Sequence, residues 1–378
     1  MIENQTTTEV FAPSRRRLPV SVRELARRVG VSTATVSRAL NNQPQVSPET
    51  RAKVLAAADE TGYQFRVGKR FTNVIGLVYP NAPVHPDEGS FEAAMISGIL
   101  RGIDEQRFDL QFVNIDRDRA EGESISQLFR RKGLRGVIIR SVRSTPNLAE
   151  EISDDGFPSI LIADHSDHPN VNCIRSESGQ SSAIAVDHLA QLGHKRIAYV
   201  GHIIVDADHR DRDRGFRAGM ARNGLEIDEE LILSTPGTSA GGTVAIDRML
   251  ALPDPPTAMY FTTPPATLGA LQRCLQLGIR VPTDLSIVGF DDSTTRLRSF
   301  PNYAAVCQDA AQLGLEAARW LTRSLEGIAD ERFQVMRPTT FEPGRSTCVA
   351  PATPTRLLPT GRVARGGGAS SEHGFGVE

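Results

Sequence analysis

The chain has 378 residues, of which 39% are hydrophobic and 23% charged, and its formal net charge is −2. This is an ordinary globular composition, and the length suggests two or three domains. No apolar run approaches the roughly 18 residues of a membrane helix, and none follows the basic cluster Arg15–Arg17, so we expect neither a membrane span nor a secretory signal. The four cysteines lie far apart, which argues against a zinc site or a disulfide framework and favours a reducing cytoplasm.

The charges are unevenly distributed along the chain. Residues 1–70 contain 12 basic and 6 acidic side chains, so this part carries +6 and the rest of the chain −8. A basic head on an acidic body suggests that only the head meets a polyanion, although charge alone is also compatible with a solvated surface.

Three short helices are expected within residues 20–62. Ser21 begins the first helix with a capping-box pattern, and Gly30 ends it. Ser32 is the expected cap of the second helix, and Pro48 opens the third at the position where proline is favoured. Two short helices joined by a tight turn that contains glycine predict a helix-turn-helix.

The second of these helices has a face that could read DNA. Val36 and Leu40 are expected to face the core, which leaves small and polar residues on other faces of the helix. Arg38 could contact guanine O6 and N7, and hydroxyl side chains beside it could hold phosphates. The predicted contacts on this helix are Thr33, Ala34, Thr35, Ser37 and Arg38.

In detail, this part of the sequence resembles the head of the lactose-repressor (LacI/GalR) family. The resemblance is carried by residues 21–26, 30–41, 46–51 and 62–63. It implies a helix-turn-helix DNA-binding domain over residues 18–63. The alternative, a three-helix bundle that merely has a basic face, does not account for the match in residue types.

The segment 64–73 is expected to be a hinge or linker, and here the resemblance weakens. The segment is shorter than the family's pattern, lacks its leucine, and contains the helix-disfavouring Gly68. Arg66 and Lys69 could still hold phosphates, and an apolar side chain could enter the minor groove, but an ordinary basic linker is equally compatible. Whether the hinge kinks DNA stays open.

From residue 74 onward, apolar runs alternate with helical patterns. This alternation predicts two doubly wound parallel sheets with a ligand site at the carboxyl ends of their strands. The expected strands are Val74–Tyr79, Leu110–Asn114, Gly136–Arg140, Ser159–Ala163, Arg196–Gly201, Thr257–Phe261 and Leu285–Phe290. The expected helices include Phe91–Gln106, Ser182–Leu192, Phe216–Asn223, Ala240–Leu250, Thr267–Leu277 and Ala311–Leu325.

The family resemblance continues through this core, in residues 192–198, 212–216 and 278–292. It implies a periplasmic-binding-protein-like α/β core over residues 74–349. Subdomain 1 is expected at about 74–175 and 306–337, and subdomain 2 at about 176–305 and 338–349. The tail, residues 350–378, is rich in Pro, Gly, Ser and Arg and is expected to be disordered, without a leucine heptad that would make a tetramer.

A sugar site needs forked donors and acceptors that converge. By the resemblance, Arg212 matches the family's ligand-contacting arginine, Asp291 its acidic acceptor, and Asp164 a further contact. Alternatively, these acids could cap helices and the arginine could be one more solvated charge. Thr263 and Thr238 stand where the family often has asparagine and an aromatic residue, and we include both in the predicted effector site.

The remaining motifs do not indicate an enzyme. The Asp164-His165-x-x-His168 pattern lacks a third ligand at motif spacing, so a polar loop is favoured over a metal site. The nucleophile elbow, the Walker loop and the dinucleotide fingerprint are absent, and no cofactor is expected. The sequence therefore predicts a cytoplasmic, homodimeric repressor that binds a palindromic operator. A small molecule, expected to be a sugar or a sugar derivative, would control it. The alternatives are a sugar-binding transport protein or an α/β enzyme.

Overall fold

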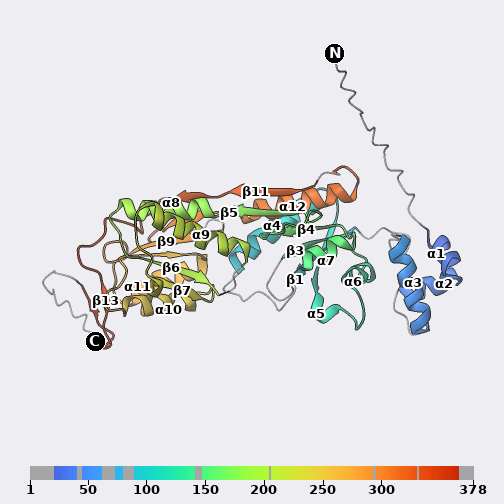
Figure 1. The fold of residues 1–378 in the computed structure, drawn as a ribbon, viewed down its shortest axis with the longest axis horizontal. Helices are drawn as coiled ribbons and strands as arrows, with labels where there is room; N and C mark the ends of the chain where they lie inside the picture. The colour runs from blue at the N-terminus through green and yellow to red at the C-terminus, as the bar shows by residue number, and fades with distance from the viewer. Residues whose placement is uncertain are drawn as a thin grey trace, which may run out of the picture. The chain divides into compact units, whose positions relative to one another are not determined.

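The structure, a computed structural model, describes residues 21–40, 45–61, 73–79, 89–140, 147–203, 206–292, 295–329 and 332–365. It divides into two compact units, one with residues 1–72 and the short segment 127–133, the other with the rest of the chain. Figure 1 shows a helical head and an α/β core. Among the described helices, none has the length and hydropathy that crossing a bilayer requires.

The head consists of three helices around a small apolar core. They are α1 (Val22–Val29), α2 (Thr33–Leu40) and α3 (Pro48–Thr61). Leu25 of α1, Val36 of α2 and Val54 of α3 are completely buried against one another. The three predicted helices are confirmed, because their apolar residues recur at helical spacing and converge on this core.

The helix ends follow from local chemistry. The Glu24 amide donates to the Ser21 hydroxyl at 3.3 Å, and Gly30 ends α1 with φ of +75°, a conformation that favours glycine. The Ser32 hydroxyl accepts from the Thr35 amide at 3.0 Å, as predicted. The capping box is only half formed, because the Glu24 carboxylate pairs with Arg27 instead of returning to Ser21.

The first sheet of the core is parallel throughout, in the order β11-β5-β4-β3-β1-β2. Its strands are β1 (Val74–Tyr79), β2 (Asp109–Asn114), β3 (Gly136–Arg140), β4 (Ser159–Ile162), β5 (Cys173–Glu177) and β11 (Gln334–Pro338). The helices of this half are α4 (Gly89–Asp104), α5 (Ile115–Asp118), α6 (Ile125–Arg131), α7 (Leu148–Asp154) and α12 (Ala310–Leu325).

The second sheet has the order β12-β10-β9-β8-β6-β7, and only β12 is antiparallel to its neighbour. Its strands are β6 (Ile197–His202), β7 (Ile232–Thr235), β8 (Ala258–Phe261), β9 (Ser286–Asp291), β10 (Ala304–Cys307) and β12 (Thr340–Glu342). Its helices are α8 (Gly179–Gln191), α9 (Ala207–Arg222), α10 (Ser239–Leu250) and α11 (Pro264–Gln276), with short 3-10 turns η2 (Glu229–Leu231) and η3 (Thr295–Arg298).

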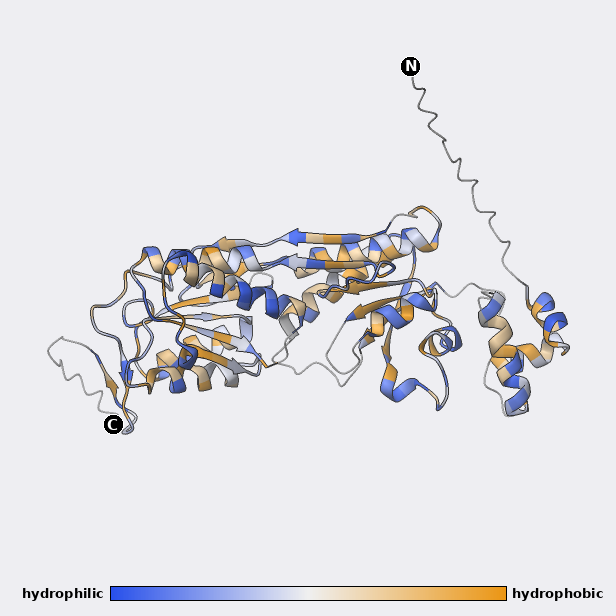
Figure 2. Cartoon of the chain, viewed as in Figure 1, coloured by the Kyte–Doolittle hydropathy of each residue, from blue (hydrophilic) through white to orange (hydrophobic). Residues whose placement is uncertain are grey.

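Helices cover both faces of the second sheet, because its strands are apolar on both sides. Along β6, Tyr199 packs toward α8 and α9, whereas Val200 packs toward α10 and α11. The helices themselves alternate hydrophobic and hydrophilic residues along their length (Figure 2). The doubly wound α/β fold expected from the sequence is thereby confirmed.

The places where the chain crosses from the first sheet to the second lie close together. Strand β5 of the first sheet leads into α8 of the second half, and Thr339 alone separates β11 from β12. The Thr339 hydroxyl donates to the Glu177 carbonyl at 2.6 Å, and the Ser181 hydroxyl donates to the Thr339 carbonyl at 2.8 Å. These bonds tie neighbouring crossings to each other. The residue limits of the two subdomains stay predictions.

The tail differs from the prediction of disorder over 350–378. Residues 356–357 and 363–364 form a small antiparallel hairpin, β13 (Arg356–Leu357) and β14 (Val363–Ala364). Leu357 and Val363 pack against the core beside α10 and α11, and Arg365 pairs with the buried Asp284 at 2.8 Å. A prediction from composition overlooks the few apolar and charged side chains that attach this hairpin to the core. Residues 366–378 lie outside the described residues.

Candidate DNA-binding helix and effector site

Helix α2 presents the predicted DNA-contacting side chains on its exposed faces. Thr33, Ala34, Ser37 and Arg38 are exposed, whereas Val36 and Leu40 are buried. Thr35 is half-buried, and its hydroxyl lies 2.8 Å from that of Ser32. The predicted DNA contacts Arg66 and Lys69, and the hinge as a whole, lie outside the described residues.

The predicted effector residues stand where strands of the core end. Asp291 is the last residue of β9 and is fully buried, with Oδ2 4.0 Å from the Arg296 Nε. Asp164 follows β4 and accepts a hydrogen bond from the His165 amide at 2.9 Å. Thr263 precedes α11, and Thr238 caps α10 by accepting from the Gly241 amide at 3.1 Å.

Arg212 is a buried side chain inside α9, with only 5% of its surface exposed. Its Nη1 donates to the Thr262 carbonyl at 2.7 Å, and its guanidinium carbon lies 3.6 Å from the centre of the Phe290 ring. These contacts bring Arg212 to the ends of β8 and β9, where Thr263 and Asp291 are the next residues along the chain. The alternative in which it is a solvated charge is therefore wrong.

A polar network around Arg212 was missed by the sequence analysis. Tyr79 donates to Glu92 at 2.9 Å, and the Arg140 Nε donates to the same carboxylate at 3.0 Å. Arg140 ends β3 in the first half of the core, yet its Nη2 lies 3.8 Å from Asp206 of the second half. Asp206 also accepts from the His209 Nδ1 at 2.7 Å.

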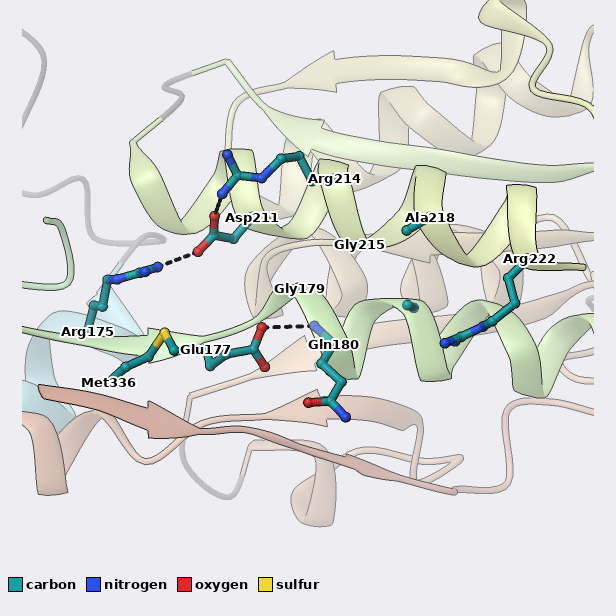
Figure 3. A pocket seen from close by; sticks show the side chains of 11 residues that line it. Arg175, Glu177, Gly179, Gln180, Asp211, Arg214, Gly215, Ala218, Arg222 and Met336 are labelled. Carbon is teal, nitrogen blue, oxygen red and sulfur yellow. Dashed lines mark hydrogen bonds and ion pairs between the residues drawn. The ribbon is translucent and has the colours of Figure 1, made fainter.

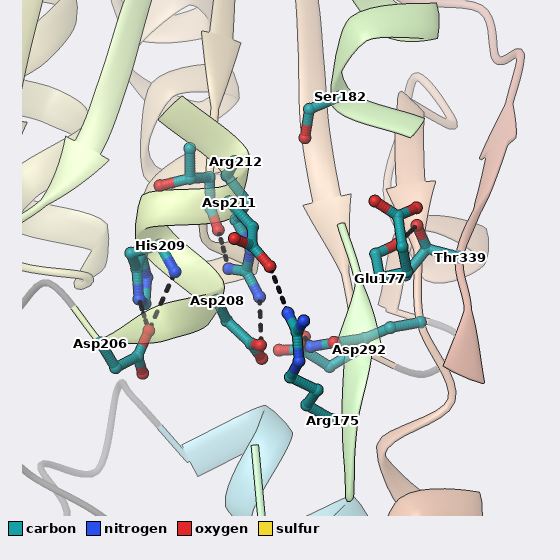
Figure 4. A network of polar contacts seen from close by, with 12 residues as sticks. Arg175, Glu177, Ser182, Asp206, Asp208, His209, Asp211, Arg212, Asp292 and Thr339 are labelled. Carbon is teal, nitrogen blue, oxygen red and sulfur yellow. Dashed lines mark hydrogen bonds and ion pairs between the residues drawn. The ribbon is translucent and has the colours of Figure 1, made fainter. Parts of the chain in front are cut away.

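Asp206, Asp208, His209 and Arg212 all belong to the start of α9 (Figure 4). Asp206 caps this helix, and Asp208 lies one turn before Arg212, with Oδ2 4.0 Å from the Arg212 Nη2. The sequence did offer a sign of this helix start, because aspartate is a standard N-cap residue and Asp206 stands three positions before His209. The many charged residues that follow Asp206 made this sign hard to recognise.

The two neighbouring carboxyl groups titrate in opposite directions. Burial and the charge of Asp206 raise the pKa of Asp208 to about 8. Burial opposes ionisation of Asp206 as well, but His209 and Arg140 outweigh it and hold the pKa of that carboxyl well below its usual range. Folding therefore favours the protonated form of Asp208 and the ionised form of Asp206.

Several buried polar atoms of this network have no hydrogen-bond partner among the described residues. They are the Asp208 Oδ1, the His209 Nε2 and the Arg212 Nε. Buried polar groups are normally satisfied, so orphaned atoms that share one helix end make this place a candidate binding site. Tyr79, Glu92 and Arg140 would border that place from the first half of the core.

A separate surface cavity of about 490 Å³ lies along α8 and α9 (Figure 3). Arg175 of β5 and Arg214 of α9 both pair with Asp211 at its edge, and the Arg175 to Asp211 distance is 2.5 Å. Arg212 does not line this cavity. The ion pair joins the two halves of the core at a second point.

The histidines of the Asp164-His165-x-x-His168 pattern diverge. The His168 Nε2 lies 3.4 Å from Asp154, while the His165 amide bonds to Asp164. Within the described part of the chain, no three metal-ligating side chains gather.

The comparisons with known proteins agree with this architecture. Residues 21–64 match the model of the bacterial regulatory proteins of the lacI family, and residues 186–347 match the periplasmic binding protein-like domain. The chain is 26% identical over 334 residues to catabolite control protein A of Priestia megaterium, covering 87% of this chain and 99% of that protein.

Two solved structures show the same fold. The transcriptional regulator CelR in complex with cellobiose superposes with a TM-score of 0.61 at 26% identity, covering 86% of this chain and 99% of that one. The lac repressor dimer bound to operator and an anti-inducer superposes with a TM-score of 0.60 at 23% identity, covering 88% and 100%. In this order the chain carries a helix-turn-helix domain that matches the bacterial regulatory proteins of the lacI family and a periplasmic binding protein-like domain, and its relatives are LacI-type transcriptional regulators.

Proposed function

We propose that this protein is a transcriptional repressor that binds a palindromic operator as a homodimer. Binding of a sugar or sugar derivative to the core would either weaken or strengthen the binding of the operator. The observation that carries the proposal is the combination in one chain of an exposed, Arg38-bearing helix α2 with a buried polar site that has unsatisfied atoms. The relatives are named regulators and repressors, and one solved relative holds cellobiose.

The proposal includes the residue roles expected from the sequence. Arg38 would read a base edge, and the small side chains of Thr33 and Ala34 would let the helix approach the groove closely. Thr35 and Ser37, with Arg66 and Lys69 of the linker, would hold phosphates. The effector would be bound by Arg212 and Asp291, and also by Asp164, Thr263 and Thr238. The domain limits are proposed as 18–63 for the head and 74–349 for the core.

We also propose that the protein acts in the cytoplasm, where its DNA target lies, and that it catalyses no reaction. A sugar-binding transport protein shares such a core, but it has no use for a DNA-binding head. An enzyme would need a nucleophile with a base or a cofactor motif, and the sequence shows neither.

The test begins with the full chain and operators selected from randomised DNA, followed by release measurements with added sugars. Arg212→Ala and Asp291→Asn should remove the effector response, because each leaves a buried polar partner unmatched. Arg214→Ala is the matched control, since Arg214 is on the same helix but 70% exposed. The proposal fails if the chain selects no DNA sequence, or if both variants respond to the sugar as the parent does.

A further inference from the structure

A cavity of about 540 Å³ lies beside the second half of α12, in the first half of the core. Its lining comes from α12, from the turn that follows this helix, and from the residues that lead into β11. The residues proposed for the effector do not line it, and neither do Arg140 and Asp206. A cavity of this volume can accept a small organic ligand, so it is a candidate for a second binding site.

Part of the lining is aromatic and already held in place. The rings of Trp320 and Phe333 are half-buried, with centres 5.4 Å apart and planes inclined by 25°. The Phe333 amide donates to the Asn172 Oδ1 at 3.0 Å, and its carbonyl accepts from the Cys173 amide at 2.7 Å. Ile328 of the same lining is 59% exposed. A planar ring of a ligand could therefore cover apolar surface here without first ordering it.

Three arginines also line the cavity, and they differ in how far they are engaged. Arg319 is fully used by Glu105, whose carboxylate accepts from its Nε at 2.9 Å and lies 2.5 Å from its Nη2. Arg332 donates only to the neutral His168 carbonyl, at 3.4 Å. The Arg323 guanidinium makes no hydrogen bond or ion pair with another described residue. Two guanidinium groups are therefore available to a ligand.

The acidic side chain of the lining does not offset these two charges. Glu316 pairs with Arg337 of β11, which lies outside the lining. Among the described residues, Arg323 and Arg332 therefore stand as two cations without a counter-charge. A phosphate ester carries about −1.5 to −2 charges at neutral pH and offers three acceptor oxygens, which suits two forked guanidinium groups.

We propose that this cavity is a second ligand site, which takes a phosphate ester that carries a planar ring, such as a nucleotide. The ring packs against Trp320 and Phe333, while the phosphate binds Arg323 and Arg332. A nucleoside would leave both arginines unpaired, and inorganic phosphate would leave the aromatic rings uncovered. The site is separate from the effector site and goes beyond the proposed function.

Trp320 is the only tryptophan of the chain, so its fluorescence reports on this cavity without a label. The full chain is titrated with AMP, GMP, CMP and UMP, and with their nucleosides, ribose 5-phosphate and inorganic phosphate. Excitation is at the red edge of the tryptophan band, where nucleobases absorb least, and calorimetry gives the affinity independently. We expect at least one nucleotide to bind roughly tenfold or more tightly than its nucleoside, ribose 5-phosphate and inorganic phosphate.

The inference is overturned if no nucleotide binds, or if the nucleoside, ribose 5-phosphate or phosphate alone binds as tightly. Arg323→Gln and Arg332→Gln should each weaken nucleotide binding roughly tenfold or more. Arg101→Gln is the matched control, because Arg101 is an exposed arginine of α4 that does not line the cavity. Parental binding by both Arg323→Gln and Arg332→Gln would show that the nucleotide does not occupy this cavity.

Arg212→Ala distinguishes this cavity from the effector site, and it should keep nucleotide binding. Loss of binding in Arg212→Ala with parental binding in Arg323→Gln would place the nucleotide in the effector site and contradict the inference.

Asp330 and Glu331 follow the lining residue Ala329 in the sequence and lie outside the described residues. Asp330→Asn combined with Glu331→Gln removes two negative charges, so this variant should bind the nucleotide at least as tightly as the parent does. Weaker binding would mean that a carboxylate rather than a guanidinium holds the ligand, and the assignment of a phosphate ester to this cavity would be wrong.

Discussion

At the scale of single residues, two side chains of α2 should have different roles in DNA binding, with Arg38 contacting a base and Thr35 a phosphate. Arg38 is exposed, so Arg38→Ala should cost about 1–3 kcal/mol and relax preference at one symmetric base pair, which we expect to be G·C. Thr35→Ala should weaken all sequences about equally, because phosphates are alike. Binding selection on randomised operators distinguishes these effects.

The control for this prediction is Lys53→Ala, which removes an exposed charge of α3 that pairs with Glu49. It should leave base preference intact. The assigned roles are reversed if Arg38→Ala keeps the parental preference while Thr35→Ala changes it.

Asp208 should make stability depend on pH in an unusual direction. Its pKa is about 8 in the folded chain, against roughly 4 when unfolded, so between these values unfolding releases a proton. The free energy of unfolding should therefore fall as pH rises from 4 to 8, by about 1 kcal/mol per pH unit from this group. Asp208→Asn removes that slope.

Urea denaturation of parent and variant between pH 5 and 8.5 measures this effect. Asp208→Asn should be the more stable of the two at pH 8, with the gap narrowing toward pH 5. Asp213→Asn, on the same helix but 36% exposed and paired with Arg217, should follow the parent. A constant gap across the range would show that Asp208 is ionised throughout.

At the scale of elements, the close approach of α8 and α9 depends on a glycine. A Cβ added at Gly215 would lie 2.1 Å from the Gly179 carbonyl oxygen, a backbone atom that cannot move aside alone. Gly215→Ala should therefore push α9, which carries Arg212, away from α8, at a cost of about 1–3 kcal/mol in the free energy of unfolding.

Gly224→Ala is the comparison within the same region. The space around Gly224 is open, but its φ is +65°, so alanine there should cost only the backbone strain, about 1–2 kcal/mol. Gly215→Ala should also weaken effector binding, whereas Gly224→Ala should not. If Gly215→Ala were harmless in both measurements, the packing of α8 on α9 would be looser than described.

At the scale of the whole molecule, the uneven charge should make operator binding and effector binding differ in their dependence on salt. The first 70 residues carry +6 and the rest −8. Operator affinity should fall steeply with salt, by about 100-fold between 50 and 200 mM if four phosphates are neutralised. Binding of an uncharged effector should barely change over the same range.

Fluorescence anisotropy with labelled operator and calorimetry with the effector give both salt slopes. A variant that starts at Thr72 should lose operator binding and keep effector binding. Operator binding by that variant at parental strength would place the DNA contacts in the core and contradict the assignment to the head.

Much of the architecture was determined by the sequence alone. The head could be predicted because Ser21, Gly30, Ser32 and Pro48 act on their own helix ends through local hydrogen bonds and backbone preferences. The buried strands β1, β3 and β9 could be predicted because strands covered on both faces are continuously apolar.

Only the tertiary structure reveals the elements whose residues are buried by parts of the chain that are remote in sequence. Strands β5 and β11 are polar and partly exposed, and they pair across about 160 residues of chain. Helix α9 begins at Ala207, well before the predicted Phe216, because its charged first turns are buried by ion pairs rather than by apolar packing.

The same distinction separates the parts of the effector site. Arg212 and Asp291 could be proposed from the resemblance to a family, residue by residue. Arg140 could not, because its meeting with Asp206 joins two halves of the core that are remote in sequence. The opposite pKa shifts of Asp206 and Asp208 likewise arise only when folding removes water from both carboxyl groups and places His209 beside Asp206.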